Sequence, residues 1–174
     1  MNLRLRGTWA ASLALLLPFG AASSVLAAPV PQTDLESLGT AESTDSISSG
    51  LTAEAHAAER NASGNLLSLT WSVENQGSSE VDFDWPQGTT YMYSNRMAYS
   101  GVTILSSNEG TRFHPVMDSA GDCLCSGNNS MDSKNFLRPG EKVVYWSMFS
   151  VPEDVESVDL EIPGFDPIED VPLS

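Results

Sequence analysis

The fold is decided by the stretch Leu66-Leu67-Ser68-Leu69-Thr70-Trp71-Ser72-Val73-Glu74-Asn75-Gln76-Gly77. Leucine, tryptophan and valine side chains alternate along it with serine, threonine and glutamate. This period of two predicts a strand with one buried face and one wet face. The polar residues 75–79 turn easily and pack poorly, so we expect the strand to end there. Because the dry face needs a second apolar sheet against it, the neighbouring segments are predicted to be strands too.

Further short strands are predicted on both sides of this stretch. They are expected at residues 51–58, 81–85, 102–105, 111–116, 142–149, 158–162 and 168–173. The alanines of 51–58 would also suit a helix, but the polar turn at 60–65 favours a hairpin with the organising strand. Segment 142–149 is the most apolar and is expected to be central, whereas prolines confine 168–173 to an edge. Seven to eight such strands predict an all-β fold, an antiparallel immunoglobulin-like β-sandwich.

The first 27 residues are typical of a secretory signal peptide. Arg4 and Arg6 precede an apolar run at 9–19, and small residues at 23–27 provide a cleavage site. A membrane anchor is the alternative, but the run is too short to span a bilayer. No later stretch is long and apolar enough to span one. We therefore expect a secreted, extracellular protein without a membrane span.

Residues 28–50 are predicted to form a disordered Ser/Thr/Pro linker, followed by the β-sandwich at 51–174. Pro29 and Pro31 open the linker, and its apolar residues are isolated among serine, threonine and acidic side chains. So little apolar surface does not offset the entropy of ordering the chain. Removal of 27 of the 174 residues leaves 147, which suits one domain plus a tail.

The charge is strongly acidic. The whole chain carries −15, and loss of the signal peptide removes two of eight basic residues and no acidic one, giving −17. Such a surface repels nucleic acid and anionic lipid, so neither is expected as a partner. A solvated surface or a cationic partner fits it better. The acidic run at 153–170 is expected to be the wet face of the last strands, or else a docking patch for a basic partner.

Cys123 and Cys125 are the most specific candidate site in the sequence. In an oxidising compartment two cysteines usually pair, and a disulfide between these two would stabilise the loop locally. Across one residue the Cα atoms lie near the upper limit of disulfide reach, so a strained bond is expected. Strain and exposure would favour a redox-labile or intermolecular disulfide. Alternatively, the two thiolates could bind Cu(I) together with His114, Met117 or Met131.

Two other surfaces are candidates for binding. Asp118, Asp122 and Asp132 surround the cysteines and could supply oxygens to calcium, although their spacing is not that of an EF-hand. A solvated acidic loop is the alternative. Aromatic residues of the segment 85–99 could line a recognition loop, or could pack inward. These aromatic residues are Trp85, Tyr91, Tyr93 and Tyr99.

We find no catalytic constellation in the sequence. Only His56 and His114 could act as a histidine base, and no serine lies in a Gly-x-Ser-x-Gly elbow. Acidic residues are too numerous for a pair of them to indicate glycoside cleavage. The chain is therefore not expected to be an enzyme or to hold a cofactor.

Several stretches resemble secreted bacterial proteins. Residues 66–77 resemble the second strand of secreted immunoglobulin-like domains in bacteria. Residues 111–119, 121–126 and 158–165 resemble uncharacterised secreted actinobacterial proteins, in some of which the domain precedes an OmpA-like peptidoglycan-binding module. The resemblance covers 51–173 and implies an immunoglobulin-like fold without a known activity. No second module is expected after Ser174, so peptidoglycan binding does not follow from it.

Together these observations predict a secreted, monomeric, non-enzymatic binding or structural module of the cell envelope or the extracellular medium. Its partner would be a protein or the cell wall, contacted through the aromatic loop 85–99 or the cysteine loop 117–138. The alternative function is that of a thiol-redox or copper-handling protein centred on Cys123 and Cys125.

Overall fold

The computed structural model describes residues 35–88, 92–127 and 135–174. Within these ranges the regular structure consists of β-strands and one 3-10 turn, η2 (Ser46–Ser48), and every pair of strands is antiparallel. The prediction of an all-β antiparallel fold is therefore confirmed. None of the described residues belongs to a helix long and apolar enough to cross a membrane.

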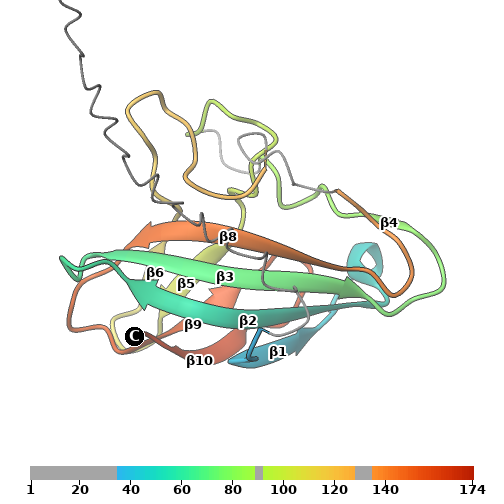
Figure 1. Cartoon of the computed structure of the whole chain (residues 1–174), viewed down its shortest axis with the longest axis horizontal. Helices are drawn as coiled ribbons and strands as arrows, with labels where there is room; N and C mark the ends of the chain where they lie inside the picture. The colour runs from blue at the N-terminus through green and yellow to red at the C-terminus, as the bar shows by residue number, and fades with distance from the viewer. Residues whose placement is uncertain (1–34, 89–91, 128–134) are drawn as a thin grey trace, which may run out of the picture. The chain divides into compact units, whose positions relative to one another are not determined.

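The first sheet has four strands in the order β1-β2-β3-β8. Its strands are β1 (Gly39–Glu42), β2 (Leu51–Arg60), β3 (Leu66–Asn75) and β8 (Lys142–Ser150). The organising stretch of the sequence is β3, which pairs with β2 on one side and with β8 on the other. Figure 1 shows β2, β3 and β8 side by side in front of the second sheet.

The second sheet also has four strands, in the order β10-β9-β5-β6. Its strands are β5 (Thr103–Ser106), β6 (Thr111–Phe113), β9 (Ser157–Glu161) and β10 (Ile168–Pro172). As predicted, β6 returns antiparallel to β5 and β10 lies at an edge. A separate two-stranded sheet joins β4 (Val81–Asp82) to β7 (Phe136–Leu137).

One apolar cluster lies between the two large sheets. The inward side chains of β3 are fully buried, as their alternation predicts; they are Leu67, Leu69, Trp71 and Val73. The second sheet contributes Ile104 and Leu160 to the same cluster. Trp71 stacks on Tyr145 of β8 with ring centroids 4.5 Å apart. The aromatic contacts therefore join the middle of the first sheet to the core, where buried apolar area stabilises the fold most.

Two predictions about strands are wrong in detail, and a third strand, although present as predicted, is irregular. Segment 142–149 is not central, because β8 is the last strand of its sheet. Residues 81–85 form only the two-residue strand β4, after which the chain turns. In β2 the pairing with β3 shifts between Ala55 and Ala57, so His56 is an extra, bulged residue. The bulge reverses the alternation and buries Ala58 instead of Ala57.

The prediction of a disordered linker does not hold for residues 39–50. Strand β1 lies within this segment and pairs with β2, and Ala41 is buried. The Ser48 hydroxyl is also buried and donates a hydrogen bond to the Gly164 carbonyl (2.5 Å). The sequence pattern did not predict this segment, because the segment is ordered mainly by backbone pairing with β2, which needs few apolar side chains. The signal peptide at 1–27 and residues 28–34 lie outside the described residues.

Candidate functional site

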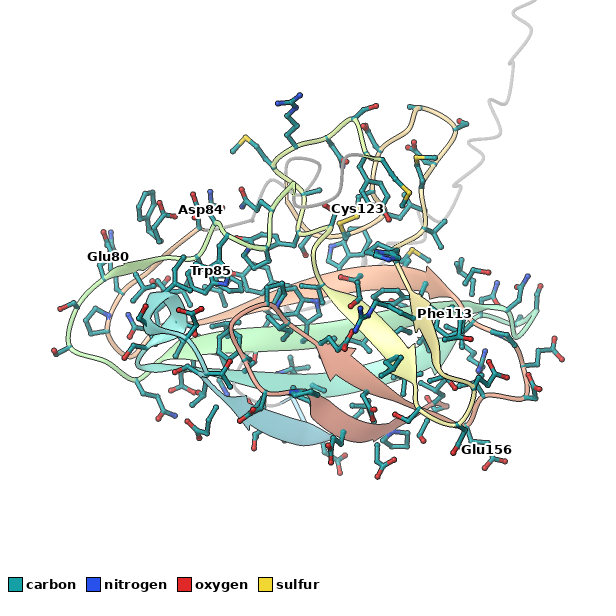
Figure 2. The ribbon with its side chains drawn as sticks, turned by 180° about the vertical axis from the view of Figure 1, so that it is seen from behind. Glu80, Asp84, Trp85, Phe113, Cys123 and Glu156 are labelled. Carbon is teal, nitrogen blue, oxygen red and sulfur yellow. A yellow bond between two sulfur atoms is a disulfide. The ribbon has the colours of Figure 1, made fainter. Side chains whose placement is uncertain are left out.

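Two loops pack against each other beside the first sheet. They comprise residues 92–100, which follow β4, and residues 117–127, which follow β6. Their shared interior is a second small cluster of buried residues, Tyr93, Ala98, Cys123 and Cys125. We call these two segments the loop pair. Figure 2 shows Cys123 among the loops above the strands.

Polar contacts fix the loop pair. The Cys123 amide donates to Asn95 Oδ1 (2.8 Å), and Asn95 Nδ2 donates to the Cys123 carbonyl (3.3 Å). The Tyr99 amide donates to the Ser126 carbonyl (2.9 Å). Gly127 has a φ of +135°, and a Cβ there would lie 2.4 Å from the Cα of Ala98. Only glycine allows the two loops to approach this closely.

Cys123 and Cys125 form a disulfide inside the loop pair. Their Cα atoms are 5.4 Å apart, which is within the usual range and not near its upper limit as the spacing suggested. The two residues are 1% and 0% exposed. Burial opposes both an intermolecular bond and easy exchange with a soluble thiol, because the attacking thiolate must reach a sulfur atom.

The loop that contains the disulfide, residues 117–127, lies along the outer edge of β8, and we call it the disulfide loop. The Ser126 amide donates to the Trp146 carbonyl, and the Trp146 amide donates to Ser126 Oγ (both 2.8 Å). The Met148 amide donates to the Leu124 carbonyl (3.0 Å), while the Leu124 amide donates to Val116 (2.8 Å). The loop thus occupies backbone groups that an end strand would otherwise expose.

The residues predicted for copper are only partly brought together. Met117 lies opposite Cys123 in an isolated bridge, and its side chain is 51% exposed. His114 is exposed as well. Both sulfur atoms of the cysteines are used by the disulfide, whereas Cu(I) binding requires thiolates. Among the described residues no group of three or more His, Cys, Asp or Glu side chains is placed to hold a metal ion.

Asp118 has a structural use that the calcium hypothesis did not include. Its Oδ1 accepts hydrogen bonds from the amides of Ala120 (2.8 Å) and Asp122 (2.9 Å). Asp118 and Asp122 also pair through their backbones. The carboxylate therefore closes its own turn, which is a common role of aspartate in loops. Asp132 lies outside the described residues.

The aromatic residues predicted to line a recognition loop do not form one surface. Tyr93 and Tyr99 are buried, and their hydroxyls donate to the carbonyls of Pro115 and Phe83. Burial raises the pKa of Tyr93. Trp85 is half-buried and donates from Nε1 to the Pro163 carbonyl (2.8 Å). Tyr91 lies outside the described residues. The described members of the set therefore anchor loops to the core.

The sequence did not indicate the pair His56 and Ser72. His56 Nε2 lies 2.8 Å from Ser72 Oγ, and Nδ1 lies 3.1 Å from the Glu36 carbonyl. A base beside a hydroxyl is the geometry of an activated nucleophile. Here Ser72 is 0% exposed, so a substrate carbonyl has no access to it. The pair fastens residues 36–38 to the sheet, and no sequence motif could reveal it because the β2 bulge creates it.

The acidic run at 153–170 contains one strongly bonded member. Glu161 on β9 receives two hydrogen bonds from Arg112 (2.7 Å each) and one from Thr103 (2.8 Å). Burial alone would raise the pKa of Glu161, but the bonds from Arg112 and Thr103 lower it below the usual value. Glu153, Asp154, Glu156 and Glu169 are exposed, as expected for a wet face.

Comparisons with known proteins assign no family. No family model matches the chain, and no curated protein matches it. A crystal structure of a functionally unknown protein from Listeria monocytogenes EGD-e is distantly similar, with 14% sequence identity and a TM-score of 0.38. The similarity covers 79% of this chain and 85% of that chain.

Proposed function

We propose that the protein is a secreted, monomeric, non-enzymatic binding module of the cell envelope or the extracellular medium. Its fold on this proposal is an immunoglobulin-like β-sandwich. Two four-stranded antiparallel sheets over one core, with Trp71 buried between them, support that assignment. The disulfide differs from that of antibody domains, because it lies within a loop and not between the sheets.

The observation that carries the proposal is the buried Cys123–Cys125 disulfide. Such bonds form and persist in oxidising compartments, which agrees with the signal-peptide pattern of residues 1–27. The bond lies in the loop pair, on which Met92, Met97 and Met117 are each about half exposed. Exposed apolar side chains of this kind gather at contact surfaces. An ordered, braced loop costs less entropy on binding than a mobile one.

The experiment is expression of the full chain, with its leader, in a bacterial secretion host. The expected product is found in the medium or the envelope fraction, begins after residue 27, and has no thiol that reacts with an alkylating reagent before reduction. Mass spectrometry with and without reduction measures both properties. Retention in the cytosol with the leader intact, or two reactive thiols in the secreted product, would refute the proposal. The latter result would favour the thiol-redox alternative.

A further inference from the structure

The outward face of β8 is apolar, unlike that of its neighbour. Val144, Trp146 and Met148 are half-buried and alternate with the inward, buried residues of the strand. The outward residues of β3 after Leu66 are polar, and all of these except the buried Ser72 are partly exposed. Strand β8 therefore has apolar side chains on both faces, although only one of these faces the core.

The strand register places small side chains around Trp146. Thr70 of β3 lies directly beside Trp146, and Ala57 of β2 lies beyond Thr70. In the next row Ser68 lies beside Met148, and Glu59 lies beyond Ser68. Glu59 is exposed, and two strand spacings put its backbone about 10 Å from that of Met148. From β8 toward β2, the side chains on this face thus change from apolar ones to the hydroxyls of Thr70 and Ser68, and then to the carboxylate of Glu59.

The disulfide loop adds to the apolar side chains on this face of β8. Cys125 lies opposite Ser147, and both are buried on the inner side. Because side chains alternate along extended chain, the half-buried Leu124 lies on the same side as Met148. The backbone bonds of Leu124 to Val116 and Met148 hold it there. We define the β8 face as Val144, Trp146, Met148, Leu124, Thr70 and Ser68.

Acidic side chains predominate beside the β8 face, where Glu54, Glu59 and Glu74 of β2 and β3 outnumber Lys142. The chain has 23 acidic and eight basic residues. Four of the basic side chains already bind acceptors of the chain itself: Arg60 holds backbone carbonyls, Arg112 holds Glu161, Arg138 lies near Glu80, and Lys142 holds Glu54 and Glu74. Arg96 is exposed on the loop pair. An apolar centre with an acidic surround suits a partner of opposite charge, which it also attracts over long range.

We propose that the β8 face docks a basic protein segment, which packs an apolar side chain on Trp146 and directs its lysines or arginines toward Glu59 and the acidic surround. This inference rests on the proposed function of binding and names its surface and the class of partner. A second copy of the chain is a poorer occupant, because each copy would bring its own net charge of −15.

The experiment measures binding of two short synthetic peptides to the mature protein by fluorescence anisotropy, at about 150 mM NaCl, where the Debye length is about 8 Å. One peptide alternates lysine with leucine and the other alternates lysine with serine. The wild-type protein is expected to bind the lysine–leucine peptide about tenfold more tightly, as one apolar anchor provides. Trp146→Thr is expected to remove that preference, and Glu59→Gln is expected to weaken the binding of both peptides.

Ile47→Thr is the matched control, because Ile47 is an exposed apolar residue of η2 outside the β8 face and the loop pair. It is expected to leave the preference unchanged. Met148→Thr is the second face variant, and urea unfolding checks that each variant is folded. Equal binding of the two peptides, or a preference that survives Trp146→Thr and Met148→Thr, overturns the inference. Trp146-dependent binding of an uncharged chitin oligosaccharide without the peptide preference also overturns it. A secreted, disulfide-bonded product would leave the proposed function standing in either case.

Discussion

Arg60 joins three parts of the chain through one guanidinium group. It lies at the end of β2 and donates hydrogen bonds to the carbonyls of Gly64 in the β2–β3 turn and of Val151, Pro152 and Val155 after β8. Pro152 accepts at 2.8 Å and Val155 at 2.7 Å. Bonds to a charged donor are stronger than neutral ones, so this residue fixes the end of the first sheet.

Replacement of Arg60 by methionine is expected to lower the free energy of unfolding by about 2–4 kcal/mol, because several carbonyls lose a charged donor. Urea unfolding followed by tryptophan fluorescence measures the change. Arg96→Met is the matched control; Arg96 is exposed in the loop pair, and its loss is expected to change stability by less than about 0.5 kcal/mol. Equal effects of the two substitutions would contradict the role of Arg60.

The sequence pattern predicts the burial of some residues well and of others poorly. Trp71 is buried where the alternation of β3 puts it. Asn75 was expected in a poorly packed turn, but it is fully buried and donates from Nδ2 to the carbonyls of Ser79 and Leu137 (2.8 Å each). Polarity predicts exposure on average, whereas a buried amide is stable wherever the backbone supplies partners. Partners distant in sequence, such as Leu137, leave no local signal.

At the scale of elements, Glu161 joins three strands. It lies on β9 and accepts hydrogen bonds from Thr103 on β5 and Arg112 on β6. Its pKa is lowered in the folded state, so its ionised form stabilises the fold above the unfolded-state pKa. That contribution is lost as the pH falls through the lower, folded-state value.

Glu161→Gln is therefore expected to cost about 1 kcal/mol at neutral pH, a modest value because the pair is partly solvated. The difference between wild type and variant should narrow as the pH falls below the usual glutamate value of 4.5 and vanish in stronger acid. Urea midpoints measured across this pH range test it. Glu156→Gln, an exposed acidic residue, should show no such pH-dependent difference. A Glu161→Gln effect that is constant with pH would contradict the assignment.

The disulfide loop should respond to reduction as a local element. The bond closes a very small loop, so the chain-entropy model gives it only about 1–2 kcal/mol. Reduction is expected to leave both sheets folded while amide exchange increases at Leu124 and Ser126, whose amides bond to Val116 and Trp146. Hydrogen exchange with mass spectrometry, with and without a reductant, measures this. Uniform loss of protection across β2 and β3 would show instead that the bond supports the whole fold.

The elements were predictable to the extent that they bury one face. Strands β3, β8 and β9 follow from alternation, because their inward positions are apolar and their outward positions mostly polar or mixed. Strand β1 was missed because backbone pairing with β2 orders it. The end position of β8 was missed because its apolar outward face looks like that of a central strand. The covering loop replaces the neighbour that the pattern predicted.

At the scale of the whole molecule, the acidic excess works against compactness. The described ion pairs, such as Lys142 with Glu54 and Arg112 with Glu161, attract locally. They involve few of the 23 acidic residues, and the chain keeps a net charge of −15. Like charges brought together by folding repel one another, so self-repulsion lowers the stability of the folded state at low salt.

Salt is therefore expected to stabilise the protein. Raising NaCl from about 10 mM to about 0.5 M shortens the Debye length from about 30 Å to about 4 Å and screens the repulsion among distant acidic groups. Short ion pairs that are partly buried lose less, so the net gain should be about 1 kcal/mol, or about 3 °C in Tm. Thermal unfolding followed by circular dichroism at fixed pH measures it. A variant with Asp154, Glu156 and Glu169, all exposed, changed to the amides should have a higher Tm at low salt and a smaller response. A Tm that falls as NaCl is added would mean that the ion pairs outweigh the repulsion.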